Sequence, residues 1–127
     1  MRVQEHSTEY KEKFVAEDAS TFVIALTTMP DDEEQTAKLA RTLVERRLAA
    51  CVSVLAPMQS TYRWQGAIEQ QVERQVVIKT TAARVAELKQ AMADLHPYDV
   101  PELLIVRVAD GAEAYLRWVD AGVGRAG

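Results

Sequence analysis

The chain has 127 residues, 48% of them hydrophobic and 27% charged, which is typical of one soluble globular domain. A formal net charge of −4 argues against a nucleic-acid-binding surface, and no segment approaches the roughly 18 apolar residues of a membrane span. Residues 1–20 are charged and lack the apolar segment of a secretory signal, so we expect a mobile tail. The single cysteine, Cys51, excludes an intrachain disulfide and suits a cytoplasmic protein.

The domain begins with TFVIALTT, a short apolar run rich in β-branched residues, which predicts a buried strand over 21–28. Pro30 ends this strand, and Asp31 with Glu34 has the spacing of a capping box. Apolar residues then recur at helical spacing as far as Leu48. This pattern predicts an amphipathic helix of about 16 residues.

Two segments of alternating polarity, 51–64 and 67–80, flank the pair Gln65–Gly66. This pattern predicts a β-hairpin. We expect the mostly apolar even-numbered positions of both arms to share one face: Val52, Val54, Ala56, Met58, Tyr62, Trp64, Ile68, Val72, Val76 and Ile78. Pro57 has no N–H group to donate to a sheet, so it marks a bulge or an edge position on the first arm.

A second helix is predicted over 82–95, because Val85, Leu88, Met92 and Leu95 fall on one face. The segment LHPYDVPE ends it, since the residue before a proline is disfavoured in helical geometry. LLIVRV then predicts a strand over 103–108.

Asp110 with Glu113 repeats the capping-box spacing and predicts a short third helix, which Gly122 would stop. We therefore expect a domain over 21–122 and a frayed end over 123–127. The order β-α-β-β-α-β plus a C-terminal helix predicts an α+β fold, the ferredoxin-like split βαβ sandwich, in which two helices cover one face of the sheet.

The length of the hairpin predicts an oligomer. Each arm of about 14 residues would extend roughly 45 Å, whereas the first helix spans only roughly 24 Å. Helices of that length leave the far end of the hairpin uncovered, with Tyr62, Trp64 and Ile68 on its apolar face. Proteins rarely leave such an edge bare, so we expect an obligate homo-oligomer with strand pairing between subunits.

Six short motifs occur in order along the domain: LAAC at 48–51, STYRW with a glycine at 60–66, IKTT at 78–81, HPY at 96–98, PE at 101–102 and YLRW at 115–118. Together they resemble the CutA family of divalent-cation tolerance proteins over nearly all of 21–122. The resemblance implies a ferredoxin-like subunit and a tight trimer similar in architecture to the PII signalling proteins. It also implies a link to copper and other divalent metals.

The resemblance further implies where a metal would bind: at a cysteine near the end of the first strand and at paired histidines before the proline. In this sequence Thr27 and Leu95 occupy the cysteine and first histidine positions, so only His96 carries over. A hydroxyl is a poor ligand for a soft metal ion, and leucine is none. His96 also suits the end of a helix, where it would bind free carbonyls and interact with the helix dipole.

Cys51 and Glu102 are further candidate metal ligands. For Cys51 the alternative is a small buried core residue, the commoner role of a free cysteine. For Glu102 the alternative is an ion pair with Lys79.

We expect a ligand cleft between subunits to be lined by Tyr62, Trp64, Glu73, Lys79, Tyr98 and Trp118. Aromatic residues with a polar tip suit interface packing equally well. Lys79 lies among β-branched apolar residues and therefore needs a carboxylate partner or an anion.

No Gly-rich phosphate loop, CxxC or HExxH spacing, or nucleophile–base pair is apparent, so we do not expect an enzyme. We predict a trimeric divalent-cation tolerance protein that binds copper or another divalent metal and takes part in the response to metal ions. The main alternative is a PII-like regulatory module that binds a small anionic ligand or a protein partner near Lys79 and Glu102. A chiefly structural scaffold is a further alternative.

Overall fold

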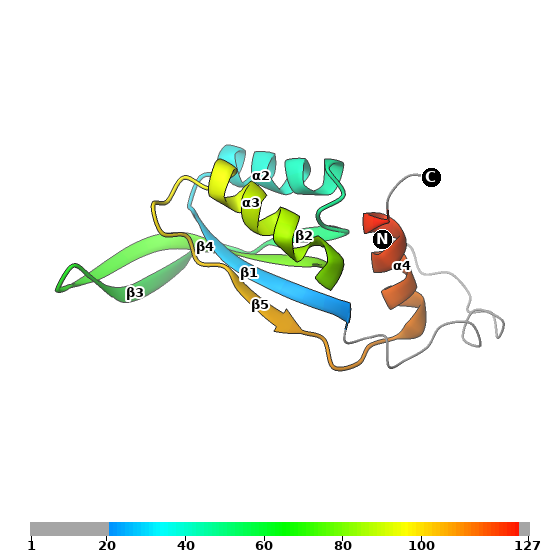
Figure 1. The fold of residues 1–127 in the computed structure, drawn as a ribbon. Coiled ribbons are helices and arrows are strands. Elements are labelled where there is room, and N and C mark those ends of the chain that lie inside the picture. The colour runs from blue at the N-terminus through cyan, green and yellow to red at the C-terminus, as the bar shows by residue number, and fades with distance from the viewer. Residues whose placement is uncertain (1–20, 125–127) are drawn as a thin grey trace.

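The structure, a computed structural model, describes residues 21–124, so the predicted tail over 1–20 and the last three residues lie outside the described part. Its elements are β1 (Phe22–Pro30), α2 (Glu33–Glu45), β2 (Cys51–Val54), β3 (Met58–Trp64), β4 (Ala67–Thr81), a short 3₁₀ helix (Ala82–Arg84), α3 (Val85–Leu95), β5 (Leu104–Arg107) and α4 (Glu113–Val123). The strands are antiparallel in the order β2-β4-β1-β5, and β3 also pairs with β4 (Figure 1). The predicted ferredoxin-like arrangement is confirmed.

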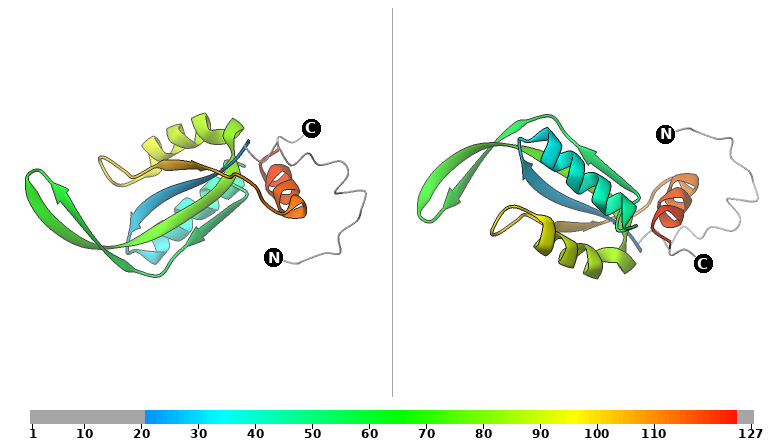
Figure 2. Two further views of the ribbon diagram at one scale, coloured as in Figure 1. Left: turned by 90° about the horizontal axis from the view of Figure 1, so that it is seen from below. Right: turned by 90° about the horizontal axis from the view of Figure 1, so that it is seen from above.

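Helices α2 and α3 lie on one face of the sheet, and the opposite face carries no helix of the described chain (Figure 2). The core between helices and sheet consists of Ala25, Met29, Leu39, Leu43, Leu48, Ala49, Val76, Ile78, Leu88, Ala91 and Met92. The hairpin of β3 and β4 extends beyond both helices at one end, and α4 lies at the other end (Figure 1). Within 21–124, no helix is long and apolar enough to cross a membrane.

Helix α2 begins one residue later than the capping-box prediction. Asp32 is the N-cap, and its Oδ1 accepts a hydrogen bond from the Gln35 N–H at 3.0 Å. Asp31 instead accepts one from Arg74 Nε at 2.9 Å. Either aspartate satisfies a helix-start pattern, and the pairing of Asp31 with a neighbouring strand leaves Asp32 to cap the helix.

Helix α2 also ends earlier than predicted, at Glu45. Arg47 adopts the left-handed conformation, with φ of 58°, and the Leu48 N–H donates to the Leu43 carbonyl at 2.9 Å. This turn closes the helix and brings Leu48 back into the core. The apolar periodicity therefore continued past the end of the helix.

The predictions for both ends of α4 were also wrong. Its N-cap is Ala112, and the Asp110 carboxylate accepts a hydrogen bond from the adjacent Gly111 N–H instead. The helix continues through Gly122 to a buried Val123. A Cβ on Gly122 would lie 3.0 Å from the Cβ of Ala50, so this glycine permits close packing rather than stopping the helix.

The hairpin turn and the bulge occur where the sequence predicted them. Gln65 and Gly66 have φ values of 49° and 83°, the positive values that a type I′ turn requires. The register changes across Pro57, because Val54 pairs with Val76 whereas Met58 pairs with Glu73. Three residues of the first arm therefore face two of the second, which defines a β-bulge.

The bulge reverses the expected faces of the outer hairpin. Beyond it Tyr62 pairs with Glu69, and Ile68 pairs with Arg63. Directly opposed residues point to the same side of a sheet, so Tyr62 and Ile68 lie on opposite faces. The prediction that all even-numbered positions share one face holds on the inner side of Pro57 and is wrong beyond it.

The helix-free face of the sheet is largely apolar. Ile24 pairs with Lys79 on one side and with Val106 on the other, which places all three on this face. Leu104 and Val106 remain 57% and 47% exposed. This open face and the projecting hairpin are the surfaces that no other described element of the chain covers.

Candidate functional site

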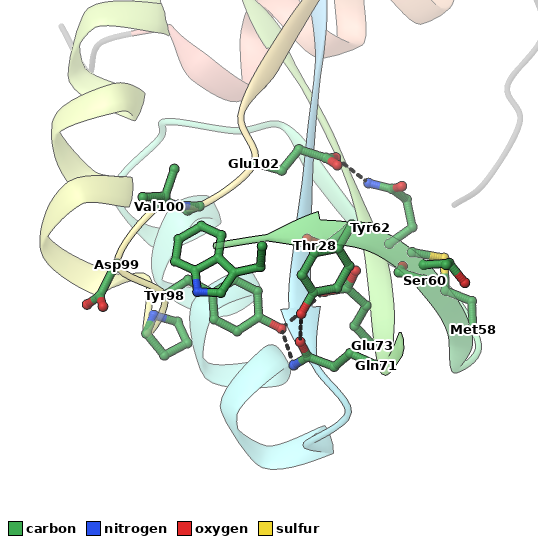
Figure 3. Close-up of a pocket in the computed structure, with 15 residues that line it drawn as sticks. Thr28, Met58, Ser60, Tyr62, Gln71, Glu73, Tyr98, Asp99, Val100 and Glu102 are labelled. Carbon is green, nitrogen blue, oxygen red and sulfur yellow. Dashed lines mark hydrogen bonds between the residues drawn. The ribbon is translucent and has the colours of Figure 1, made fainter. Parts of the chain in front are cut away.

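A pocket of about 770 Å³ lies at the base of the projecting hairpin, between strands β3 and β4 and the segment that leads from α3 to β5 (Figure 3). It is lined by Thr28, Met58, Ser60, Thr61, Tyr62, Trp64, Gln71, Glu73, Gln75, Pro97, Tyr98, Asp99, Val100, Pro101 and Glu102. Four of the six residues predicted to line a cleft meet here: Tyr62, Trp64, Glu73 and Tyr98. The bulge makes this possible, because it turns Tyr62 and Trp64 to the face of Glu73.

Tyr98 connects the loop after α3 to strand β4. Its hydroxyl donates to Glu73 Oε1 at 3.1 Å and accepts from Gln71 Nε2 at 3.2 Å (Figure 3). Tyr62 donates to Gln71 Oε1 at 2.7 Å. Burial, together with the hydrogen bond and charge of Glu73, raises the pKa of Tyr98 to about 12, so the phenol stays neutral.

His96 locks the corner that carries Tyr98. Its Nδ1 accepts a hydrogen bond from the Tyr98 N–H at 3.1 Å, so this nitrogen bears no proton. Its Nε2 lies 2.7 Å from the Thr28 carbonyl and therefore donates to it. Burial lowers the pKa of His96, although the bond to Thr28 and the charge of Glu73 oppose the shift. Both ring nitrogens are engaged, and a metal ion would have to displace one of these bonds.

Glu102 lies in the pocket, but its partner differs from the expected one. Gln75 Nε2 donates to Glu102 Oε2 at 3.0 Å (Figure 3). It also donates to the Thr27 carbonyl at 2.7 Å. Lys79 lies instead with its Nζ 5.7 Å from the centre of the Tyr115 ring. The predicted ion pair between Glu102 and Lys79 therefore does not form. Glu102 accepts an amide hydrogen bond instead, and Lys79 makes a cation–π contact.

The remaining predicted residues lie outside the pocket. Trp118 stacks on Tyr115, with ring centroids 5.6 Å apart. Cys51 is half-buried and pairs with Lys79 across strands β2 and β4, on the open face of the sheet. Within residues 21–124 no three His, Cys, Asp or Glu side chains are grouped to hold a metal ion. The three predicted metal ligands thus do not converge within one chain.

Sequence reasoning missed Gln71, Gln75 and Asp99 as pocket residues. For the two glutamines, Pro57 was the feature of the sequence that could have predicted their place in the pocket. A bulge placed there shifts the register by one residue and puts Gln71 opposite Ser60, on the face of Tyr62. Asp99 had no comparable signal, because its position depends on how the loop after α3 folds back over β4.

Comparisons with known proteins agree with the fold. The sequence profile described as CutA1 divalent ion tolerance protein matches residues 23–122. A divalent-cation tolerance protein CutA of Pectobacterium atrosepticum is 43% identical over 101 residues, 80% of this chain and 91% of the relative. The crystal structure of CutA from Xylella fastidiosa has a TM-score of 0.79 at 40% identity and covers 83% of this chain and all of that one.

A structure described as the periplasmic divalent cation tolerance protein CutA of Archaeoglobus fulgidus also matches. Its TM-score is 0.77 at 29% identity, and the match covers 81% of this chain and 99% of that one. The matches named here lend no support to the alternative of a PII-like regulatory module.

Proposed function

Because this chain belongs to the CutA1 divalent ion tolerance protein family, we propose that it is a cytoplasmic homotrimer that binds copper or another divalent cation in the response to metal ions. We assign it no catalytic role. The observation that carries the proposal is the open face of the sheet, on which candidate donors lie among exposed apolar side chains.

The apolar surface supports the oligomer. Leu104 and Val106 on the open face, and Ile68 and Val72 on the outer hairpin, are all about half exposed or more. Ile68 and Val72 lie on the opposite side of the sheet from Leu104 and Val106. Exposed apolar surface of this kind is typical of an interface between subunits. Strand pairing along the projecting hairpin would also satisfy its free backbone groups.

The positions of the donors support a metal site shared between subunits. Cys51 points to the open face, and Glu102 reaches the same face through its bond to Gln75. A thiolate and a carboxylate from neighbouring subunits, joined by water, provide donors that Cu²⁺ and Zn²⁺ accept. His96 would join them only by releasing Thr28 or Tyr98. Thr27 is fully buried on the helix-covered face, which argues against it as a ligand.

Two measurements test the proposal. Native mass spectrometry should find a trimer at micromolar concentration, and a stable monomer would refute the assembly. Calorimetric titration with Cu²⁺ and Zn²⁺ should show binding that weakens at least tenfold in Cys51→Ser and in Glu102→Gln. The control is Asp31→Asn, a carboxylate outside the pocket, which should bind like the wild type. Negligible heats in the wild type would refute metal binding.

A further inference from the structure

The pocket at the base of the hairpin carries one sign of charge. Its lining includes three carboxylates, Glu73, Asp99 and Glu102, and no lysine, arginine or histidine. The sequence had suggested that Lys79 would make this cleft attractive to an anion, but Lys79 lies over Tyr115 instead. The electrostatic preference of the pocket is therefore for a cation.

Glu73 is the least exposed of these carboxylates, with only 7% of its surface exposed. Its Oε1 accepts the Tyr98 hydroxyl, and Oε2 accepts no hydrogen bond from the described residues. Among residues 21–124, Oε2 is not one of the side-chain atoms that are sealed from solvent without a hydrogen bond, and Glu73 lines the pocket. No described residue forms an ion pair with Glu73. A nearly buried carboxylate without a cation is costly unless a ligand supplies one.

The aromatic residues that line the pocket favour an organic cation over a metal ion. Tyr62, Trp64 and Tyr98 line the pocket. Figure 3 shows the rings of Tyr62 and Tyr98 there, and the faces of such rings attract alkylated ammonium groups. A volume of about 770 Å³ falls within the range of small-molecule sites and far exceeds what a single ion needs. Aromatic walls add nothing to the coordination of a metal by oxygen.

From the carboxylates, the unpaired Oε2 and the aromatic wall, we propose that this pocket binds a small organic cation with an alkylated ammonium group. The ammonium group lies against Glu73 Oε2 and the rings of Tyr62 and Trp64. Gln71 and Gln75 offer amide groups for a polar substituent of the ligand. The pocket shares Glu102 with the proposed metal site but does not include the other donor, Cys51, and the binding of an organic cation does not depend on the metal hypothesis.

The test uses choline as the cationic probe and 3,3-dimethyl-1-butanol as its neutral isostere. Each is titrated into the full-length protein. In a Trp118→Phe background Trp64 is the only remaining tryptophan, and its fluorescence reports occupancy. We expect choline to bind at least tenfold more tightly than the neutral isostere. Equal binding of the two, or no binding of choline, overturns the proposal.

Two variants test whether choline binds in this pocket. Glu73→Gln keeps the shape of the side chain and removes its charge, so choline affinity should fall at least tenfold, as measured by calorimetry. Trp64→Leu alters an exposed side chain, which the fold should tolerate, and should weaken choline similarly. The matched control, Trp118→Leu, changes a tryptophan outside the pocket and should leave the affinity unchanged. Unchanged affinity in both Glu73→Gln and Trp64→Leu refutes the site.

Other occupants give different results. If a basic side chain of a second subunit fills the pocket, choline will not bind the oligomer, and the proposal fails. If Cu²⁺ or Zn²⁺ displaces choline in the Cys51→Ser variant, the pocket is a metal site instead, and the proposal again fails. Choline binding that persists in Cys51→Ser while metal binding is lost shows that the pocket binds choline without the metal. The two proposals can thus stand or fall separately.

Discussion

The buried hydroxyl of Thr27 makes a specific stability prediction. Its Oγ1 is sealed from solvent and has no hydrogen-bond partner among the described residues, and the Thr27 side chain is 0% exposed. Leaving a buried hydroxyl unpaired costs about 1–3 kcal/mol. Thr27→Val keeps the branched shape and removes the polar atom, so we expect stability to rise by about 1 kcal/mol or more. For a domain of this size that corresponds to about 4 °C in Tm.

Thr36 provides a matched control. It is also buried, at 3% exposure, but its hydroxyl donates toward the carbonyls of Asp32 at 2.9 Å and Glu33 at 3.1 Å. Thr36→Val should therefore lower stability by about 1 kcal/mol. Thr80 is a second unpaired buried hydroxyl, and Thr80→Val should act in the same direction as Thr27→Val.

The assay is urea and thermal unfolding at a single protein concentration, because association adds a concentration-dependent contribution to apparent stability. The slope m should be unchanged, so that a shifted midpoint reports a change in stability. If Thr27→Val lowers the midpoint as much as Thr36→Val does, the hydroxyl of Thr27 has a partner or a role that the structure does not display, and the reasoning is wrong.

Three further predictions concern local features. The pKa of His96 is lowered in the folded state, so the unfolded chain binds the proton more readily. Wild-type stability should be complete above about pH 6.5 and fall as the pH drops below it, whereas His96→Gln should lack this part of the slope in urea unfolding. Asp32→Ala removes the N-cap of α2 and should lower stability by about 1 kcal/mol. Asp31→Ala should lower stability by less, because the ion pair of Asp31 with Arg74 is partly exposed. If thermal unfolding shows the larger loss for Asp31→Ala, then Asp31 rather than Asp32 is the N-cap. Arg84→Ala leaves the Val123 carbonyl without its donor and should cost about 2 kcal/mol, with faster amide exchange in α4; equal exchange in variant and wild type would contradict this anchoring role.

Much of the site was readable from the sequence because its geometry follows from local rules. Pro57 predicted the bulge, since it has no N–H for the sheet, and the stiff corner around His96 follows from the prolines on either side of Tyr98. The consequence of the bulge was missed, because the face of each later residue depends on counting the pairing from Glu73 outward.

The sequence by itself determined the order of the elements, the Gln65–Gly66 turn and the two-layer fold, because these depend on periodicity and backbone preference within short segments. Only the tertiary structure decided which side chains meet. It joined both ring nitrogens of His96 to the backbone, placed Lys79 over Tyr115 and left Glu73 facing an aromatic pocket without a basic residue. The contacts of His96 with Thr28 and of Lys79 with Tyr115 join residues 68 and 36 positions apart, where register and packing, rather than local preference, determine distance.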